Sequence, residues 1–180
     1  MRKIVASLFI SLDGVVEAPE TWHFPYFNDE MGAVVGSLSM ESDTMLLGRN
    51  TYQMFAGFWP HQGDDVEMAA QMNGTDKLVV SSTLDSVDEW QNSTLLQGDP
   101  IEELTALKKG SGKNLNTVGS VTLVRSLLRT KLLDELHLLV HPIAVGHGVR
   151  LFDEGETQPL ELVSNSTFAT GVLHSVYRPA

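Results

Sequence analysis

Strand-like and helix-like segments alternate along almost the whole chain, and this alternation is the strongest constraint on its fold. Apolar, β-compatible runs occupy residues 4–12, 44–47, 77–80, 115–118 and 135–140. Between them lie segments whose apolar residues recur at the three- and four-residue spacing of an amphipathic helix. Strands connected through helices pair in parallel, and the helices cover the faces of the sheet. The sequence therefore predicts a three-layer α/β domain with a mostly parallel central sheet and helices on both faces.

The clearest helix spans residues 100–109. Asp99 precedes it as an N-cap, Pro100 opens it, two glutamates follow, and two lysines close its last turn before a glycine. This order of charges complements the helix dipole. Further helices are expected over residues 28–38, with Asn28 as the cap, over 64–73 and over 121–130.

The C-terminal tail has a different pattern. Residues 160–163 and 168–177 alternate between apolar and polar side chains, and the polar stretch 164–167 is typical of a turn. We expect a closing antiparallel hairpin there. No linker divides the chain, so residues 1–180 are expected to form one domain.

Composition excludes several classes of protein. Twelve Lys and Arg against 23 Asp and Glu give a net charge of −11, which argues against a nucleic-acid surface. With no cysteine, the chain has no disulfide scaffold, thiolate metal site or cysteine nucleophile. No apolar run is long enough for a membrane span, and the N-terminus lacks the features of a secretory signal, so a cytoplasmic protein is expected.

Two predicted strand–turn–helix units carry glycine at the turn, at Gly48 and at Gly119. Glycine allows a ligand to approach the backbone, and the following helix N-terminus is a ready site for an anion. Arg49 follows the first glycine and can form paired hydrogen bonds with a phosphate. Neither turn matches the usual dinucleotide or P-loop fingerprint, so ordinary tight turns are the alternative.

These motifs resemble a known family. The turn Gly48-Arg49-x-Thr51, the strand exit Val79-Val80-Ser81-Ser82 and the helix start Gly119-Ser120 look like the nucleotide site of the dihydrofolate reductase fold. The motif SLDG at residues 11–14 and the stretch 132–152 resemble the stand-alone relatives of the reductase domain of bifunctional riboflavin biosynthesis enzymes. The resemblance covers residues 3–177.

The resemblance implies NADPH as the cofactor and hydride transfer as the chemistry. It assigns the adenosine 2′-phosphate side to Gly48, Arg49, Thr51, Ser81 and Ser82, and the pyrophosphate side to Gly119, Ser120, Thr122 and Leu123. The chain departs from the family at Val121, where relatives often carry a small residue. A valine side chain there would crowd the phosphate path.

On the substrate side the resemblance implies as candidates Asp13, which faces the nicotinamide pocket in the riboflavin-type branch, and Asp29 or Glu30, near the start of the first helix. We expect one of them to position the substrate or a proton-delivering water. Turn formation is the alternative role for Asp13, and complementing the helix dipole is the alternative for Asp29. Trp22, Phe24, Tyr26 and Phe27 are candidates for the walls of a flat-ring pocket or for core positions.

No metal site is assigned. His137 and His141 share a face of one predicted strand but would lie about 13 Å apart, too far for one ion. The zinc deaminase domain of the bifunctional enzymes needs cysteine ligands, so this chain is not expected to deaminate.

The most consistent interpretation is an NADPH-dependent reductase of a small cyclic or carbonyl-containing metabolite, without nucleic-acid or membrane partners. A nucleotide-binding module without turnover is the alternative. We also expect a homodimer, in which the apolar strand 136–140 together with the C-terminal strands offers an interface either at a sheet edge or through a sheet face.

Overall fold

Eight strands form a single mixed sheet in the computed structural model, which describes residues 1–63, 65–152, 155 and 157–180. The strands are β1 (Ile4–Ser11), β2 (Ser42–Gly48), β3 (Asp76–Val80), β4 (Ser93–Leu95), β5 (Asn114–Val118), β6 (Glu135–His141), β7 (Leu160–Thr167) and β8 (Leu173–Pro179). Their order across the sheet is β4-β3-β2-β5-β1-β6-β8-β7. Strands β1 to β6 pair in parallel, and β8 is antiparallel to both β6 and β7. The predicted mixed sheet with an antiparallel C-terminal pair is confirmed.

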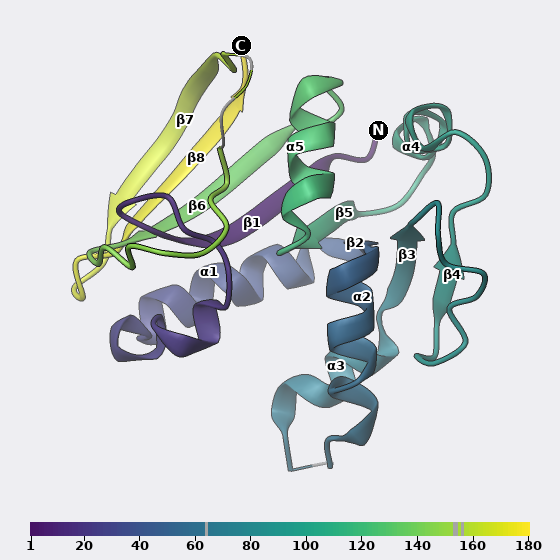
Figure 1. Ribbon diagram of the computed structural model, residues 1–180, viewed down its shortest axis with the longest axis horizontal. Helices are drawn as coiled ribbons and strands as arrows, with labels where there is room; N and C mark the ends of the chain where they lie inside the picture. The colour runs from purple at the N-terminus through teal and green to yellow at the C-terminus, as the bar shows by residue number, and fades with distance from the viewer. Residues whose placement is uncertain (64, 153–154, 156) are drawn as a thin grey trace.

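Helices cover both faces of this sheet (Figure 1). They are α1 (Asp29–Met40), α2 (Arg49–Ala56), α3 (Glu67–Gly74), α4 (Pro100–Lys109) and α5 (Val121–Arg129), with short 3-10 turns η1 (Pro19–Thr21), η2 (Phe24–Tyr26) and η3 (Trp59–His61). Leu104 of α4 and Leu127 of α5 pack on one face in a core that includes Leu46. On the opposite face, α1 and α2 contribute Met31 and Tyr52 to two smaller cores. In the described part of the chain, no helix has the length and apolar character needed to cross a bilayer.

The local signals for the helix starts are confirmed. The Asn28 side chain accepts a hydrogen bond from the amide of Met31 at 3.0 Å, and Asp99 caps α4 in the same way. The helix expected over residues 64–73 begins at Glu67 instead, and Asp64 lies outside the described residues.

The C-terminal hairpin differs from the prediction. Residues 164–167 lie within β7 rather than in a turn, and the chain reverses at residues 168–172. Gly171 supplies the positive φ of +84° that this reversal needs, while Phe168 and Val172 bury their side chains beside it. Because β7 is exposed along nearly its whole length, it contains polar residues that resemble a turn in sequence.

The predicted dimer strand is also not at an edge. β6 lies between β1 and β8, and Leu136 and Leu138 are buried in the core beneath α5. The free edge on this side of the sheet belongs to β7.

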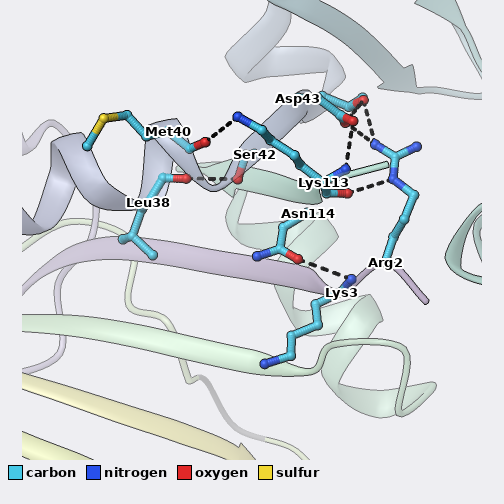
Figure 2. Close-up of polar contacts among 9 residues, drawn as sticks. Arg2, Lys3, Leu38, Met40, Ser42, Asp43, Lys113 and Asn114 are labelled. Carbon is cyan, nitrogen blue, oxygen red and sulfur yellow. Dashed lines mark hydrogen bonds and ion pairs between the residues drawn. The ribbon is translucent and has the colours of Figure 1, made fainter. Parts of the chain in front are cut away.

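A polar network links the N-terminal ends of β1, β2 and β5 (Figure 2). Arg2 is paired with Asp43 and donates to the carbonyl of Lys113 at 2.7 Å. The amide of Lys113 donates in turn to Asp43 at 2.8 Å, and its ammonium group donates to the carbonyl of Met40, the last residue of α1. The charged groups at this end of the sheet are therefore used to join β1, β2 and β5, and the candidate site lies at the opposite end.

Candidate functional site

The C-terminal ends of the parallel strands form one end of the sheet, which we call its carboxyl edge, and they do not end level with one another, so this edge has a step. The β1–β5 ladder ends where Ser7 faces Val118, whereas the β1–β6 ladder continues to Ser11 opposite His141. Residues 8–11 of β1 therefore extend past the end of β5. The turn Gly119-Ser120 lies at the foot of this step, because it follows β5 directly.

The two glycine turns are hydrogen-bonded to each other beside this step. The amide of Gly48 donates to the hydroxyl oxygen of Ser120 at 3.0 Å, and the amide of Ser120 donates to the hydroxyl oxygen of Thr51 at 3.0 Å. The space next to Gly48 is filled by Ser120 and Leu123, so that a β-carbon built on Gly48 would lie 3.7 Å and 3.8 Å from them. Four of the predicted cofactor residues, Gly48, Thr51, Ser120 and Leu123, therefore form one contiguous structure.

This fastening gives Thr51 and Ser120 a role that the sequence did not indicate. Both side chains are nearly buried, and each accepts a backbone hydrogen bond from the other turn. Ser120 adopts a left-handed conformation with φ +47°, which is costly for a residue other than glycine. We conclude that the two hydroxyls hold the turns in register.

The helices that start at these turns have no side-chain caps. Neither Gly48 at the start of α2 nor Ser120 at the start of α5 offers a hydrogen bond to its own helix. The first N–H groups of an α-helix have no partner within the helix and carry the positive end of its dipole. Thr122 is exposed on the first turn of α5, and Val121 is half-buried against the core. Two adjacent helix N-termini at one edge can together hold a diphosphate.

Arg49 connects the ends of β2 and β3. Its guanidinium donates to the hydroxyl of Thr83 at 3.0 Å and to the side chain of Asn50 at 3.3 Å. The hydroxyl of Ser81 accepts hydrogen bonds from the amides of Thr83 and Leu84 and so shapes the turn after β3, whereas Ser82 is exposed. Arg49, Ser81 and Ser82 are thus brought together with Thr83, whose hydroxyl the sequence also places at the exit of this strand.

Asp13 lies in a closed set of contacts. Its carboxylate accepts hydrogen bonds from the Ser11 hydroxyl at 2.6 Å and from the amides of Val145 and Gly146 at 3.0 Å and 2.8 Å. These hydrogen bonds, with that from Ser11 the largest, lower the pKa of Asp13 to about 2. The group is therefore ionised at neutral pH and cannot act as a proton donor there, while a role in positioning substrate stays a prediction.

Asp29 is exposed in the first turn of α1, where its charge complements the helix dipole. The neighbouring carboxylate, Glu30, accepts hydrogen bonds from the Asn28 side chain at 2.8 Å and from the amide of Ala169 at 2.7 Å. These contacts tie the start of α1 to the turn between β7 and β8.

The aromatic residues before α1 divide into two groups. Trp22 and Tyr26 lie with their rings 5.2 Å and 5.7 Å from the ring of His141, whereas Phe24 and Phe27 are 64% and 50% exposed. The segment therefore contributes both to the core and to an exposed apolar surface, and a role of Phe24 and Phe27 as pocket walls stays a prediction. The segment also contains His23, which sequence reasoning did not identify because an isolated histidine carries no spacing signal.

In the part of the chain that the structure describes, no three His, Asp or Glu side chains are grouped so that they could hold a metal ion. His137 pairs with His174 at 3.0 Å between ring nitrogens, and His141 pairs with the carbonyl of Leu139 at 2.8 Å. The two histidines that share the face of β6 thus have separate partners.

Two proteins of Bacillus subtilis (strain 168) are similar in sequence over nearly their whole length. YyaP is 28% identical over 98% of this chain and 94% of its own, and YwjB is 28% identical over 97% and 98%. Both carry names that describe them as uncharacterized.

Solved structures share the fold. A protein from Shewanella sp. PV-4 with a provisional riboflavin-biosynthesis name superimposes with a TM-score of 0.76, at 21% identity and over 99% of both chains. A pyrimidine reductase-like protein from Corynebacterium diphtheriae gives a TM-score of 0.67, at 16% identity, over 99% of this chain and 92% of that one. The fold is thus the dihydrofolate reductase-like fold that the sequence motifs predicted. The family model of the RibD C-terminal domain matches residues 2–174, and the chain therefore belongs to the RibD C-terminal domain family.

Proposed function

We propose that this protein is a cytoplasmic, NADPH-dependent reductase of a small cyclic or carbonyl-containing metabolite. The substrate class would be that of 5-amino-6-(5-phosphoribosylamino)uracil or of dihydrofolate. Membership of a reductase-like family supports oxidoreductase chemistry. The cofactor and the substrate class are those that the sequence resemblance implies.

The observation that carries this proposal is the pair of uncapped helix N-termini fastened side by side at the carboxyl edge. The N-termini of α2 and α5 would hold the pyrophosphate. Arg49, next to Ser81 and Thr83, would bind the 2′-phosphate that distinguishes NADPH from NADH. When bound, the nicotinamide supplies the hydride, and the step along residues 8–11 of β1 offers a place for its ring.

A nucleotide-binding module without turnover is the second candidate, and one observation favours it. Asp13 is ionised and held by loop amides, and Asp29 is exposed, so neither carboxyl group is presented as an evident acid. Turnover then requires another source for the proton that accompanies the hydride.

We further propose a homodimer that forms through β7. This strand ends the sheet, is exposed on both faces and carries Leu162 and Val163, which are 54% and 53% exposed. An exposed edge strand of this kind is a ready template for pairing with another chain. Antiparallel pairing of two β7 strands about a twofold axis would join the two sheets and give a closed assembly.

NADPH binding is the test of the function. The melting temperature should rise with NADPH, because a ligand at 100 times its Kd adds about 2.7 kcal/mol of stability. Loss of NADPH absorbance with a pyrimidine or pterin substrate would then separate the reductase from the binding module. A protein whose melting temperature and tryptophan fluorescence are both unchanged by saturating NADPH would refute the proposal.

A further inference from the structure

Two histidines lie beside Phe9 of β1, and each has one ring nitrogen that is buried and has no hydrogen-bond partner among the described residues. His141 is fully buried, and its Nδ1 lies 2.8 Å from the carbonyl oxygen of Leu139. A carbonyl only accepts, so Nδ1 carries the proton and Nε2 of the neutral ring carries a lone pair. That Nε2 is buried and has no hydrogen-bond partner among the described residues.

His23 is the neighbouring ring. It is 7% exposed and lies between Phe9 of β1, stacked at 4.6 Å, and Phe24, at 4.2 Å. Its Nδ1 is also buried without a partner in the described part of the chain. The rings of His23 and His141 are 6.1 Å apart and nearly perpendicular, at 89°.

Two unpaired polar atoms in neighbouring buried rings call for an explanation. An unsatisfied buried nitrogen costs about 1–3 kcal/mol, and such atoms are rare in folded proteins. One water between the rings would satisfy both, because it can accept from an N–H of His23 and donate to the lone pair of His141. This arrangement would place the proton of neutral His23 on Nδ1 and leave its Nε2 as the exchangeable position.

We propose that His23 is the proton donor of the reduction and that His141 positions it through a bridging water. The inference rests on the reductase function proposed above. It supplies the proton source that neither carboxylate offers, since Asp13 is ionised and held by amides and Asp29 is exposed.

Hydride adds to the carbon of a C=N or C=O bond with its two electrons, and the π pair of that bond moves to the nitrogen or oxygen. That atom takes the proton from Nε2 of the His23 imidazolium and becomes an amine or alcohol. Neutral His23 then regains a proton at Nε2 from solvent, and one proton is consumed for each hydride.

Because the proton donor is the imidazolium form of His23, the rate of reduction depends on pH. Burial, and next to it His141, lower the pKa of His23, while Glu20 from η1 acts in the opposite direction. Burial lowers the pKa of His141, against the backbone carbonyls of Leu139 and Ile10, which raise it, and so favours the neutral ring that can accept. The rate of reduction should therefore fall as pH rises above the lowered pKa of His23, beginning below pH 6.5.

The first experiment uses ¹⁵N-labelled histidine in the full-length protein. We expect neutral His141 and neutral His23 both to carry the proton on Nδ1. In His141→Phe, which suits its aromatic surroundings, His23 should lose that preference. His23 protonated on Nε2 in the wild type, or unaffected by His141→Phe, would overturn the proposal. If His141→Phe does not fold, the wild-type tautomer alone decides.

The second experiment measures single-turnover oxidation of NADPH, with 7,8-dihydrofolate and 5-amino-6-(5-phosphoribosylamino)uracil as probes. His23→Gln should bind NADPH as tightly as the wild type, lose at least about 100-fold in rate and lose the pH dependence. The matched control is His61→Gln, an exposed histidine in η3, which should leave both unchanged. An unaltered rate and pH profile in His23→Gln would refute the donor role while leaving the reductase function intact. A wild type that fails to bind NADPH would refute the reductase function instead, and the histidine tautomers would still report on the water bridge.

Discussion

The amide of Ser120 donates a hydrogen bond to the hydroxyl of Thr51 at 3.0 Å and so joins the helix start after β5 to the helix that follows β2. In return, the Ser120 hydroxyl accepts from the amide of Gly48. The relative position of the two helix N-termini is therefore set by two hydroxyl groups.

Removing the Ser120 hydroxyl should destabilise the protein. Ser120→Ala leaves the amide of Gly48 without its acceptor, which costs about 1–3 kcal/mol when the group is buried. Ser120→Gly loses the same acceptor but relieves the left-handed backbone, so it should be the more stable of the two variants. Urea unfolding measures both. An alanine variant as stable as the wild type would show that the hydroxyl contributes nothing to the junction.

Arg49→Ala should abolish the preference for NADPH over NADH. Losing a charge-assisted contact to the 2′-phosphate costs about 1.5–3 kcal/mol, or roughly tenfold to a hundredfold in Kd, whereas NADH affinity should barely change. The matched control is Arg129→Ala, which removes an equal charge from the exposed end of α5. Titrations at two salt concentrations separate a close contact from long-range steering. Equal selectivity in Arg49→Ala and the wild type would reject the assigned role.

Asp13 should make stability depend on pH in acid. Its pKa is about 2 in the folded protein against 3.8 as the ordinary value, so its contribution is fully present above about pH 4 and is lost as pH falls toward 2. The wild type should therefore lose more stability over this range than Asp13→Asn does. Asp85→Asn, an exposed aspartate, is the control and should follow the wild type. Parallel curves for wild type and Asp13→Asn would show that the carboxylate contacts are not made in solution.

Val163→Lys should convert the dimer to a monomer. A lysine on an exposed edge strand opposes strand pairing, and Val163 lies within β7. Met40→Lys, at an exposed position that ends α1, adds the same charge elsewhere and should leave the dimer intact. Light scattering at micromolar concentration reports the mass. A monomeric wild type, or a dimeric Val163→Lys variant, would place the interface elsewhere or exclude it.

Local signals predicted the fold better than they predicted the site. The caps at Asn28 and Asp99 act within one helical turn, so the sequence alone located both helix starts. The polar residues 164–167 resemble a turn in the sequence because an edge strand that is exposed on both faces lacks the alternation that identifies a strand. β4 was missed because three residues carry too little pattern.

The site depends on contacts between distant segments. The glycine turns were visible in the sequence, but the bonds among Gly48, Thr51 and Ser120 follow from the order of strands in the sheet. His23 and His141 meet only because β1 and β6 are neighbours and the segment before α1 folds over them. No spacing along the chain encodes such a pair.

The loops after β1 and β6 are joined through Asp13, through the bond from the amide of Val149 to Glu17 and through the bridge between Val15 and Arg150. A substitution in either loop must therefore preserve the contacts with the other loop, so we expect both loops to tolerate few substitutions. Phe24 and Phe27, in the segment before α1, are exposed and escape that constraint. Substitutions at these two positions should therefore leave the two loops joined.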